Sequence, residues 1–182
     1  MRCLIIGCGC RGQLLARALI EAGNLVRGTT RDRARLSEIE SARAEGVLAD
    51  PDRVMTLMGA LDHVSVTCIL LGSASASPEH VRALHGTRLE MLLTKLVDTT
   101  VRGVVYEARG SVSDDILAGG VERVRAFAER AVANAVLLDA DPGRPHEWVS
   151  AALDAVELAV GGGGSVDSAV RNPCTRLQMD KS

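Results

Sequence analysis

Short apolar runs alternate with stretches of helical periodicity along most of this 182-residue chain. The apolar runs have the length of buried strands, and the stretches between them repeat apolar residues at intervals of three and four, as amphipathic helices do. This regular alternation predicts an α/β protein with a parallel sheet. The expected strands lie at residues 2–6, 25–28, 46–49, within 61–71, 103–106 and 135–139, and the expected helices at residues 13–22, 32–44, 52–58, 79–97, 121–133 and 145–160.

Six strands connected by helices favour a doubly wound, Rossmann-like sheet. Right-handed crossovers and a switch point beside the first strand give the strand order 3-2-1-4-5-6. A run of four glycines at residues 161–164 ends the last helical pattern, and the residues that follow are polar and without periodicity. We therefore expect one domain over residues 1–160 and a disordered tail over residues 161–182.

Composition excludes several classes of partner. Hydrophobic residues make up 47% of the chain and the net charge is −2, which allows a core but gives no basic surface for nucleic acid or a membrane. The only aromatic residues are Tyr106, Phe127 and Trp148, too few for a base-stacking platform. No apolar run reaches the ~18 residues of a membrane span, and the chain opens in a strand pattern rather than a leader.

The cysteines favour a reduced, cytoplasmic setting. They are five in number and occupy the expected strands, the first turn and the tail, at positions Cys3, Cys8, Cys10, Cys68 and Cys174. The spacing Cys8-x-Cys10 has a metal or redox alternative, but no Cys-x-x-Cys motif or clustered histidine accompanies it. We expect two small side chains tolerated in a glycine-rich turn, and no metal site.

That turn carries the strongest functional pattern in the chain. It joins the first strand to the first helix with the sequence Gly7-Cys8-Gly9-Cys10-Arg11-Gly12. The first glycine permits a tight turn, the second lets the backbone approach phosphates, and the third lets the helix pack on the strand. The free N–H groups and the positive end of the helix then face an anion. The pattern predicts a dinucleotide site.

Two other glycine loops do not fit. A phosphate loop for ATP or GTP ends in Gly-Lys-Ser/Thr, whereas this turn continues as Gly12-Gln13-Leu14. The loop of methyltransferases that use S-adenosylmethionine usually has an acid two residues before its first glycine and a glycine two residues after its second. This chain has Ile5 and Arg11 at those positions.

The end of the second strand favours NADP over NAD. NAD-binding chains usually place an Asp or Glu there to hold the ribose 2′-hydroxyl, whereas this chain has Gly28-Thr29-Thr30-Arg31. The guanidinium of Arg31, with the hydroxyl of Thr30 beside it, suits a 2′-phosphate. Arg11 in the turn offers a second positive charge. Arg33 and Arg35 are expected on the solvated face of the next helix.

Asp50 follows the third strand, near the expected position of an adenine. Its carboxylate can accept a hydrogen bond from the adenine amino group. It can equally cap the helical segment that begins after Pro51. Both interpretations stay open at this point.

The sequence resembles the extended and atypical branch of the short-chain dehydrogenase/reductase superfamily, in the group labelled NAD-dependent epimerase/dehydratase-like. The resemblance covers about residues 1–141 and is carried by residues 5–12, Gly28-Thr29-Thr30-Arg31, Ala49-Asp50-Pro51, Gly86-Thr87 and residues 102–106. It implies a Rossmann-like fold with NADP bound by Gly7, Gly9, Cys10, Arg11, Gly12, Thr30, Arg31 and Asp50. It also implies that the cofactor passes Leu71 and the small residues after it toward its nicotinamide.

The chain departs from this family at the catalytic pair. Active members carry Tyr-x-x-x-Lys after the fifth strand, where the lysine lowers the pKa of the tyrosine. Here the only tyrosine is Tyr106, expected inside the strand, with Gly110 four residues on. Ser111 and Ser113 follow, as polar active-site candidates or as loop residues. The substrate-binding segment of extended members is also missing after the sixth strand.

Two functions therefore remain from the sequence. One is an NADP-dependent oxidoreductase or epimerase-like enzyme, whose catalytic residues we leave unassigned. The other is a non-catalytic NADP-binding sensor or interaction module. His85, His146 and the acids Asp139 and Asp141 are the groups whose positions need a structure, and Trp148 is expected in a core or an interface. A homodimer through the long apolar helix is the expected assembly.

Overall fold

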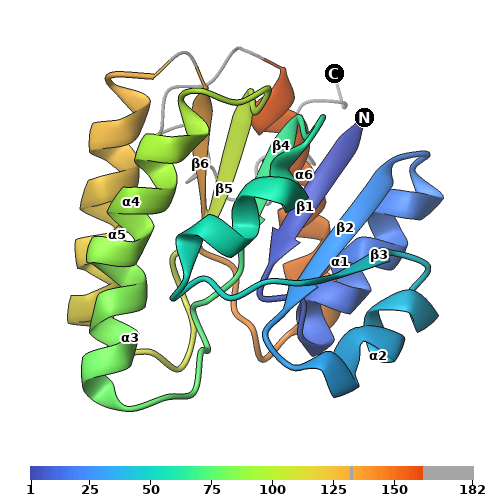
Figure 1. Ribbon diagram of the computed structural model, residues 1–182, viewed down its shortest axis with the longest axis horizontal. Coiled ribbons are helices and arrows are strands. Elements are labelled where there is room, and N and C mark those ends of the chain that lie inside the picture. Colours follow the sequence, from blue (N-terminus) through green and yellow to red (C-terminus); the bar gives the residue numbers. More distant parts are fainter. Residues whose placement is uncertain (132, 162–182) are drawn as a thin grey trace, which may run out of the picture.

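The computed structural model, described over residues 1–131 and 133–161, contains a six-stranded, fully parallel sheet (Figure 1). Its strands lie in the order β3-β2-β1-β4-β5-β6, so the expected fold class and strand order are confirmed. The strands are β1 (Arg2–Ile6), β2 (Leu25–Thr30), β3 (Glu45–Leu48), β4 (Val66–Ile69), β5 (Gly103–Glu107) and β6 (Asn134–Leu138). Residues 162–182, nearly all of the expected tail, lie outside the described residues.

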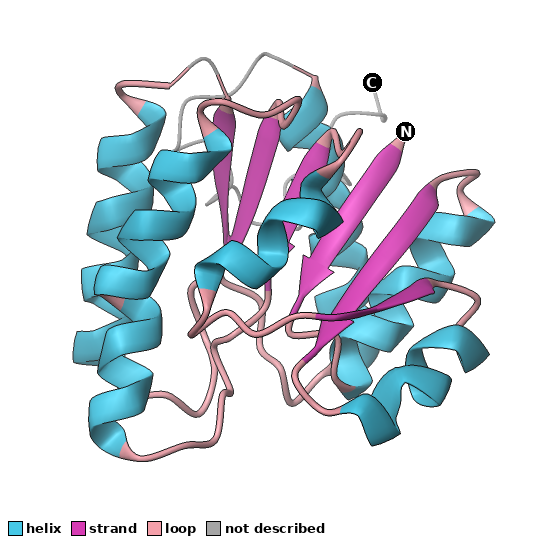
Figure 2. Cartoon of the chain, in the orientation of Figure 1, coloured by secondary structure: helices cyan, strands magenta, loops and turns pink. Residues whose placement is uncertain are grey.

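Helices cover both faces of the sheet (Figure 2). One face carries α1 (Cys10–Glu21), α2 (Leu36–Ser41) and α6 (Pro145–Val160). The other carries α4 (Thr87–Leu96), α5 (Asp114–Ala128) and a 3-10 segment, η2 (Val54–Leu61), while α3 (Pro78–His85) packs beside α5. The sheet is therefore the middle of three layers, and only its edges and strand ends are left for a ligand.

The alternation of side chains along β1 divides the core in two. Cys3 and Ile5 point into the layer that contains α1 and α6, and Leu4 and Ile6 point into the layer that contains α4 and α5. All four are fully buried. A strand buried on both faces reads as a continuous apolar run, which is why the sequence shows no polar alternation here.

Glycines explain two differences from the expected helices. The long helix expected over residues 79–97 is broken at Gly86, whose φ of −105° and ψ of −110° are not helical, and it becomes α3 and α4. Helix α5 begins at Asp114 instead of residue 121. Its start carries acidic residues that favour a helix N-terminus, and the glycine pair Gly119-Gly120 is accommodated inside the helix.

Three shorter segments also differ from expectation. Helix α1 begins at Cys10, so the glycine turn is shorter than expected. The helix expected over residues 32–44 is a 3-10 turn, η1 (Arg33–Arg35), followed by the short α2, and Arg43 leaves helical geometry with a φ of 65°. The segment expected as a helix over residues 52–58 is the 3-10 segment η2.

Candidate functional site

The turn between β1 and α1 has the geometry expected from its three glycines. Gly7 has a φ of 82°, and a Cβ there would lie 2.6 Å from the carbonyl oxygen of Leu70. Gly9 caps α1 and faces open space, since nothing lies within 4 Å of where its Cβ would be. A Cβ on Gly12 would lie 3.2 Å from Ile5, so the helix packs closely on its strand.

A cleft of about 470 Å³ opens above this turn, at the carboxyl ends of the strands. A topological switch point between β1 and β4 places the cleft where open α/β sheets bind ligands. Every expected cofactor-binding residue except Asp50 lines it. The lining residues are Gly7, Cys8, Gly9, Cys10, Arg11, Gly12, Thr29, Thr30, Arg31, Arg35, Ala49, Pro51, Leu70, Leu71, Ser73, Ala74, Ser75, Ala76 and Leu84.

Asp50 has a local partner instead. Its carboxylate oxygen Oδ1 accepts a hydrogen bond of 3.0 Å from the backbone N–H of Asp52, and its own N–H donates to the hydroxyl of Thr56 at 2.9 Å. These bonds shape the turn that leads into η2. Its neighbours Ala49 and Pro51 line the cleft while Asp50 does not, so the geometry favours the capping interpretation.

Two arginines lie at the end of β2. Arg31 is exposed and has no hydrogen bond or ion pair within the described part of the chain. Arg35 is exposed, as expected, and it also lines the cleft, which the sequence did not predict. It donates to Glu38 at 3.1 and 3.2 Å, and this carboxylate raises the pKa of the guanidinium. Arg33 is exposed and does not line the cleft, as expected.

Arg11 points to the other side of the turn, toward β4 and β5. Its Nη2 donates to Glu107 Oε1 and to Ser73 Oγ, both at 2.9 Å. The guanidinium lies 5.5 Å from the ring centre of Trp148, within cation–π range. β1 lies between β2 and the strands that Arg11 contacts, so this geometry does not favour Arg11 as a second contact for a 2′-phosphate.

Glu107 is the residue of this region that sequence reasoning missed. It ends β5, is fully buried, and accepts a second hydrogen bond through Oε2 from the backbone N–H of Gly72 at 2.8 Å. Burial raises its pKa, while Arg11 and the Gly72 N–H act in the opposite direction. The sequence did contain a signal for Glu107, because an acid at the end of an apolar strand lies where the carboxyl ends of parallel strands bind ligands.

Tyr106 lies inside the sheet and is not exposed to the cleft. Its hydroxyl is 2.7 Å from Nδ1 of His85, whose Nε2 is 3.1 Å from the carbonyl oxygen of Leu71. A carbonyl only accepts, so His85 carries its proton on Nε2 and the tyrosine hydroxyl donates to Nδ1. Burial lowers the pKa of His85 and raises that of Tyr106. The structural interpretation of Tyr106 therefore fits, and the catalytic one does not.

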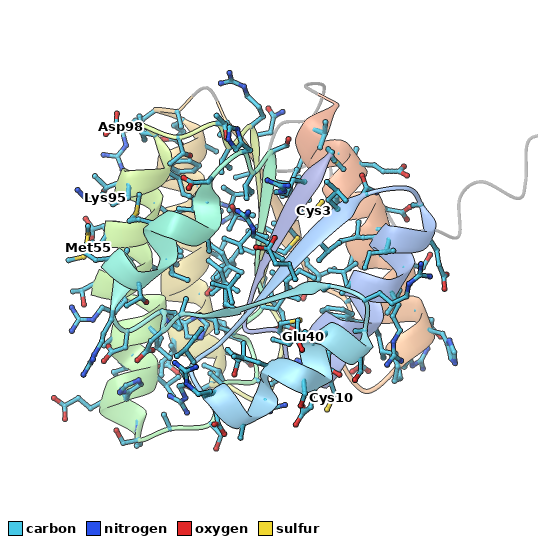
Figure 3. The ribbon with its side chains drawn as sticks, turned by 45° about the vertical axis from the view of Figure 1, so that its right-hand side comes forward. Cys3, Cys10, Glu40, Met55, Lys95 and Asp98 are labelled. Carbon is cyan, nitrogen blue, oxygen red and sulfur yellow. The ribbon has the colours of Figure 1, made fainter. Side chains whose placement is uncertain are left out.

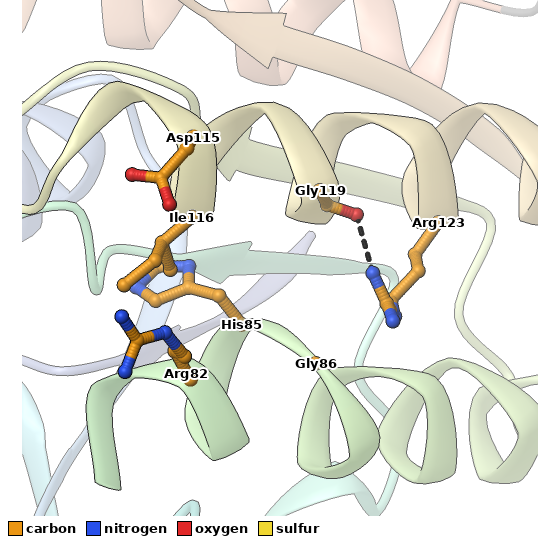
Figure 4. A pocket seen from close by; sticks show the side chains of 7 residues that line it. All are labelled: Arg82, His85, Gly86, Asp115, Ile116, Gly119 and Arg123. Atoms are coloured by element: carbon orange, nitrogen blue, oxygen red, sulfur yellow. Dashed lines mark hydrogen bonds between the residues drawn. The ribbon is translucent and has the colours of Figure 1, made fainter. Parts of the chain in front are cut away.

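His85 also lines a second hollow of about 260 Å³, between α5 and the end of α3 at Gly86 (Figure 4). Arg82 and Asp115 stand beside the imidazole at one end. At the other end Arg123 donates to the carbonyl oxygen of Gly119 at 2.7 Å. The histidine thus separates this hollow from Leu71, which lines the cleft.

The other candidate groups lie away from the cleft. Ser111, Ser113, His146, Asp139 and Asp141 are all exposed, and none of them lines it. Asp141 accepts a hydrogen bond from the N–H of Gly143, which gives it a turn-forming role. Trp148 is fully buried in the core beside α1, as expected for a core residue.

The two cysteines of the turn face different environments. Cys10 is exposed at the start of α1, at the rim of the cleft (Figure 3). Cys8 is buried against β2, where its Sγ lies 2.6 Å from the position of a Cβ on Gly28, and burial raises its pKa to about 12. No group of three or more His, Cys, Asp or Glu side chains is placed to hold a metal ion within residues 1–131 and 133–161.

No protein-family model matches the sequence, and a search of curated proteins finds no relative. Solved structures do match. A UDP-glucose 4-epimerase from Thermotoga maritima aligns with a TM-score of 0.63 at 14% identity, over 75% of this chain and 54% of the epimerase. A short-chain dehydrogenase/reductase superfamily protein from Agrobacterium tumefaciens with bound NAD aligns with a TM-score of 0.62 at 17% identity, over 75% of this chain and 48% of that protein. A UDP-glucuronic acid 4-epimerase from Bacillus cereus in complex with NAD aligns with a TM-score of 0.59 at 13% identity, over 75% of this chain and 55% of the epimerase.

These likenesses establish the fold. The chain has the Rossmann-like architecture found in short-chain dehydrogenases and sugar-nucleotide epimerases, in agreement with the resemblance seen in the sequence. The aligned part of the chain spans about half of the length of these three structures. None of the helices within the described residues has the length and hydrophobicity to cross a membrane.

Proposed function

We propose that this chain binds NADP in the cleft above the β1–α1 turn and acts there as a nucleotide-binding module. The observation that carries the proposal is the cleft itself, where a glycine turn, a helix N-terminus and three arginines line one hollow. Similar folds hold NAD in the structures from Agrobacterium tumefaciens and Bacillus cereus. A crevice at the switch point of an open, parallel sheet is the place where Rossmann-like folds bind dinucleotides.

The pyrophosphate has donors at the start of α1. The first backbone N–H groups of a helix have no partner within it, and here they belong to Cys10, Arg11 and Gly12. They point into a part of the cleft that Gly9 leaves open. Two phosphates placed there would be held by these groups and by the positive end of the helix dipole.

The choice of NADP rests on the end of β2. Arg31 is exposed and lines the cleft, with Thr30 beside it and Arg35 nearby on the same wall. Two guanidinium groups suit a dianionic 2′-phosphate, whereas the ribose hydroxyls of NAD need an acceptor at this place. The side chains of this wall offer no free carboxylate, since none of the residues lining the cleft is acidic.

Binding without catalysis is the better supported function. The ionisable side chains that line the cleft are the arginines Arg11, Arg31 and Arg35 and the thiols of Cys8, which is buried, and Cys10, which is exposed. Proton transfer to a substrate carbonyl or hydroxyl needs a positioned acid or base with a pKa near the working pH, which an arginine does not supply. An NADP-dependent oxidoreductase or epimerase-like activity is the second candidate, favoured by the functions named for the similar structures.

Calorimetric titration with NADPH and NADH tests the proposed ligand. We expect NADPH to bind about tenfold or more tightly, and Arg31→Ala to weaken NADPH by roughly 10- to 100-fold, the worth of a charged hydrogen bond, while NADH is unaffected. Arg33→Ala is the matched control, because Arg33 is exposed and outside the cleft. Equal affinities for the two cofactors, or equal losses in both variants, would contradict the NADP assignment.

A turnover assay separates the two functions. NADPH is incubated with the protein and a panel of sugar nucleotides, aldehydes and ketones, and the loss of its absorbance is followed. We expect no oxidation above the rate without protein. Turnover with any substrate of the panel, abolished when binding is lost in Arg31→Ala, would establish the oxidoreductase instead.

A further inference from the structure

A dinucleotide-binding sheet has two halves, and each half holds one mononucleotide. In this chain the cleft is lined by residues at the ends of β1, β2 and β3, by the start of α1, by Arg35, by the loop after β4 and by Leu84 of α3. Among the described residues, none that belongs to β5, β6 or α6 lines it. The cleft is therefore open over the half that would receive an adenine nucleotide, and over the other half it reaches the loop after β4 and Leu84 but not the ends of β5 and β6.

Side chains of this protein occupy the junction between the two halves. Arg11 reaches from the glycine turn across to Glu107 at the end of β5, and donates to Ser73 on the way. Glu107 accepts a further bond from the N–H of Gly72. One buried carboxylate thus ties together the β1–α1 turn, the loop after β4 and the end of β5.

The loops around this ion pair are packed too tightly to admit a ring. A Cβ on Gly72 would lie 2.7 Å from the carbonyl oxygen of Arg109, and the backbone of Gly110 packs directly against that of Gly72. The N–H of Ser111 donates to the hydroxyl of Ser73 at 3.3 Å. The loops that follow β4 and β5 are therefore joined to each other at the carboxyl end of the second half of the sheet.

Opening the junction is opposed by the burial of Glu107. The carboxylate is fully buried, and the Arg11 guanidinium that neutralises it lies against Trp148. Moving Arg11 aside would leave an uncompensated charge in the interior, which proteins strongly disfavour. The closed junction is thus part of the folded core.

Arg11 still faces the ligand. It lines the cleft, and its Nε has no hydrogen-bond partner within the described part of the chain. This N–H is shielded from solvent, so Arg11 acts on a phosphate in the cleft through the positive charge of its guanidinium.

We infer that the cleft recognises the adenosine 5′-diphosphate end of its ligand and offers no place for a nicotinamide ring at the ends of β5 and β6. The inference rests on the proposed function and narrows it. The ligand class is an adenine nucleotide with a 2′-phosphate, in which all recognition ends at the diphosphate, whether or not a nicotinamide riboside follows. Such a site reports on a nucleotide pool without regard to the redox state of the nicotinamide.

The test compares two ligands that differ in the ring alone. NADP⁺ and 2′-phospho-ADP-ribose are titrated into the full chain by calorimetry, with NADPH as a third ligand. Dissociation constants that agree within about threefold for all three support the inference. A tenfold tighter binding of NADP⁺ or NADPH than of 2′-phospho-ADP-ribose overturns it and leaves the proposed function standing. No binding of any of the three overturns the proposed function, and the inference with it.

A double variant tests the closing role of the ion pair. Arg11→Ala with Glu107→Gln removes the side chain and the charge together, so that no unpaired carboxylate remains. We expect it to bind NADP⁺ at least threefold more tightly than 2′-phospho-ADP-ribose, because the ring gains access. An unchanged ratio overturns the closing role. Arg35→Ala is the control, expected to weaken both ligands equally, and the comparison on the unaltered chain decides the inference even where the double variant does not fold.

Discussion

The two halves of this sheet have the same topology and opposite surfaces at their ligand edge. The half built from β1, β2 and β3 ends in glycines, threonines and exposed arginines, and it is hollow. The half built from β4, β5 and β6 ends in buried polar groups, Tyr106 and Glu107, that already have partners inside the protein. A parallel sheet supplies the edge, and the residues that end its strands decide whether a ligand can use it.

The same contrast separates binding from stability. Arg31 of the first half makes no hydrogen bond or ion pair within the described residues and is free for a ligand, while Thr30 and Arg35 bond only to neighbours a few residues away. The buried Tyr106 and Glu107 of the second half have their partners in the interior. Substitutions in the first half should therefore change affinity alone, whereas substitutions in the second half should lower the free energy of unfolding.

The largest effect is expected for Arg11→Met. The substitution leaves Glu107 buried without a cation, which should lower the free energy of unfolding by about 3 kcal/mol. Urea denaturation at neutral pH measures it. Arg31→Met is the matched variant of the open half and should change stability by less than about 0.5 kcal/mol. Similar losses in the two variants would remove the contrast, and Arg11→Met combined with Glu107→Leu should recover most of the loss.

A smaller loss is expected for Gly120→Ala on α5. An added Cβ would overlap the hydroxyl of Tyr106, so overpacking should cost about 2 kcal/mol despite the better helix propensity of alanine. Gly119→Ala is the control, since only the end of Arg123 lies near its Cβ, at 3.5 Å, and it should gain up to about 1 kcal/mol. Thermal and urea unfolding distinguish the two. A gain in both variants would mean that α5 shifts freely above the sheet.

Removing the hydroxyl of Tyr106 should lower the free energy of unfolding by less than Gly120→Ala does. Tyr106→Phe leaves Nδ1 of His85 buried without its donor, with an expected loss of about 1 to 2 kcal/mol. The cost of Gly120→Ala should shrink in this background, because the overlapping oxygen is gone. A double-mutant cycle measures that coupling, and a loss in the double variant equal to the sum of the two single losses would show that the two positions are not coupled.

The smallest effect is a dependence of stability on pH. Burial lowers the pKa of His85, whose ordinary value is 6.5, so the folded chain keeps it neutral where the unfolded chain takes up a proton. The stabilisation that neutral His85 gives the folded chain is complete above pH 6.5 and is lost as the pH falls below that value. The free energy of unfolding should fall by no more than about 1.4 kcal/mol per pH unit. Unfolding curves from pH 7 to 5 should show the slope. His85→Gln should flatten it, and the exposed His146→Gln should not.

The fold follows from the sequence because its determinants are local. Apolar runs such as residues 2–6 and the helical periodicity after them define the elements, and right-handed crossovers then fix the order of the strands. The glycine turn is predictable for the same reason, since its three glycines act within one strand–turn–helix unit. These features can be predicted without knowing which residues meet across the sheet.

The second half of the site depends on contacts that one sequence does not display. Arg11 and Glu107 are 96 residues apart, so the partner of the arginine is visible only after folding. Arg35 lines the cleft from η1, a 3-10 turn that periodicity did not distinguish from an α-helix.

Cys8 and Gly28 share a single space between the first turn and β2. The sulfur atom occupies the position that a side chain at residue 28 would take, and Ile39 closes the same space from α2, 2.8 Å from that position. The two positions therefore form a size-exchange pair: a larger residue at 28 is expected only together with a smaller one at 8. In related sequences, residues 8 and 28 should therefore co-vary: a change in side-chain size at one position should be accompanied by the opposite change at the other.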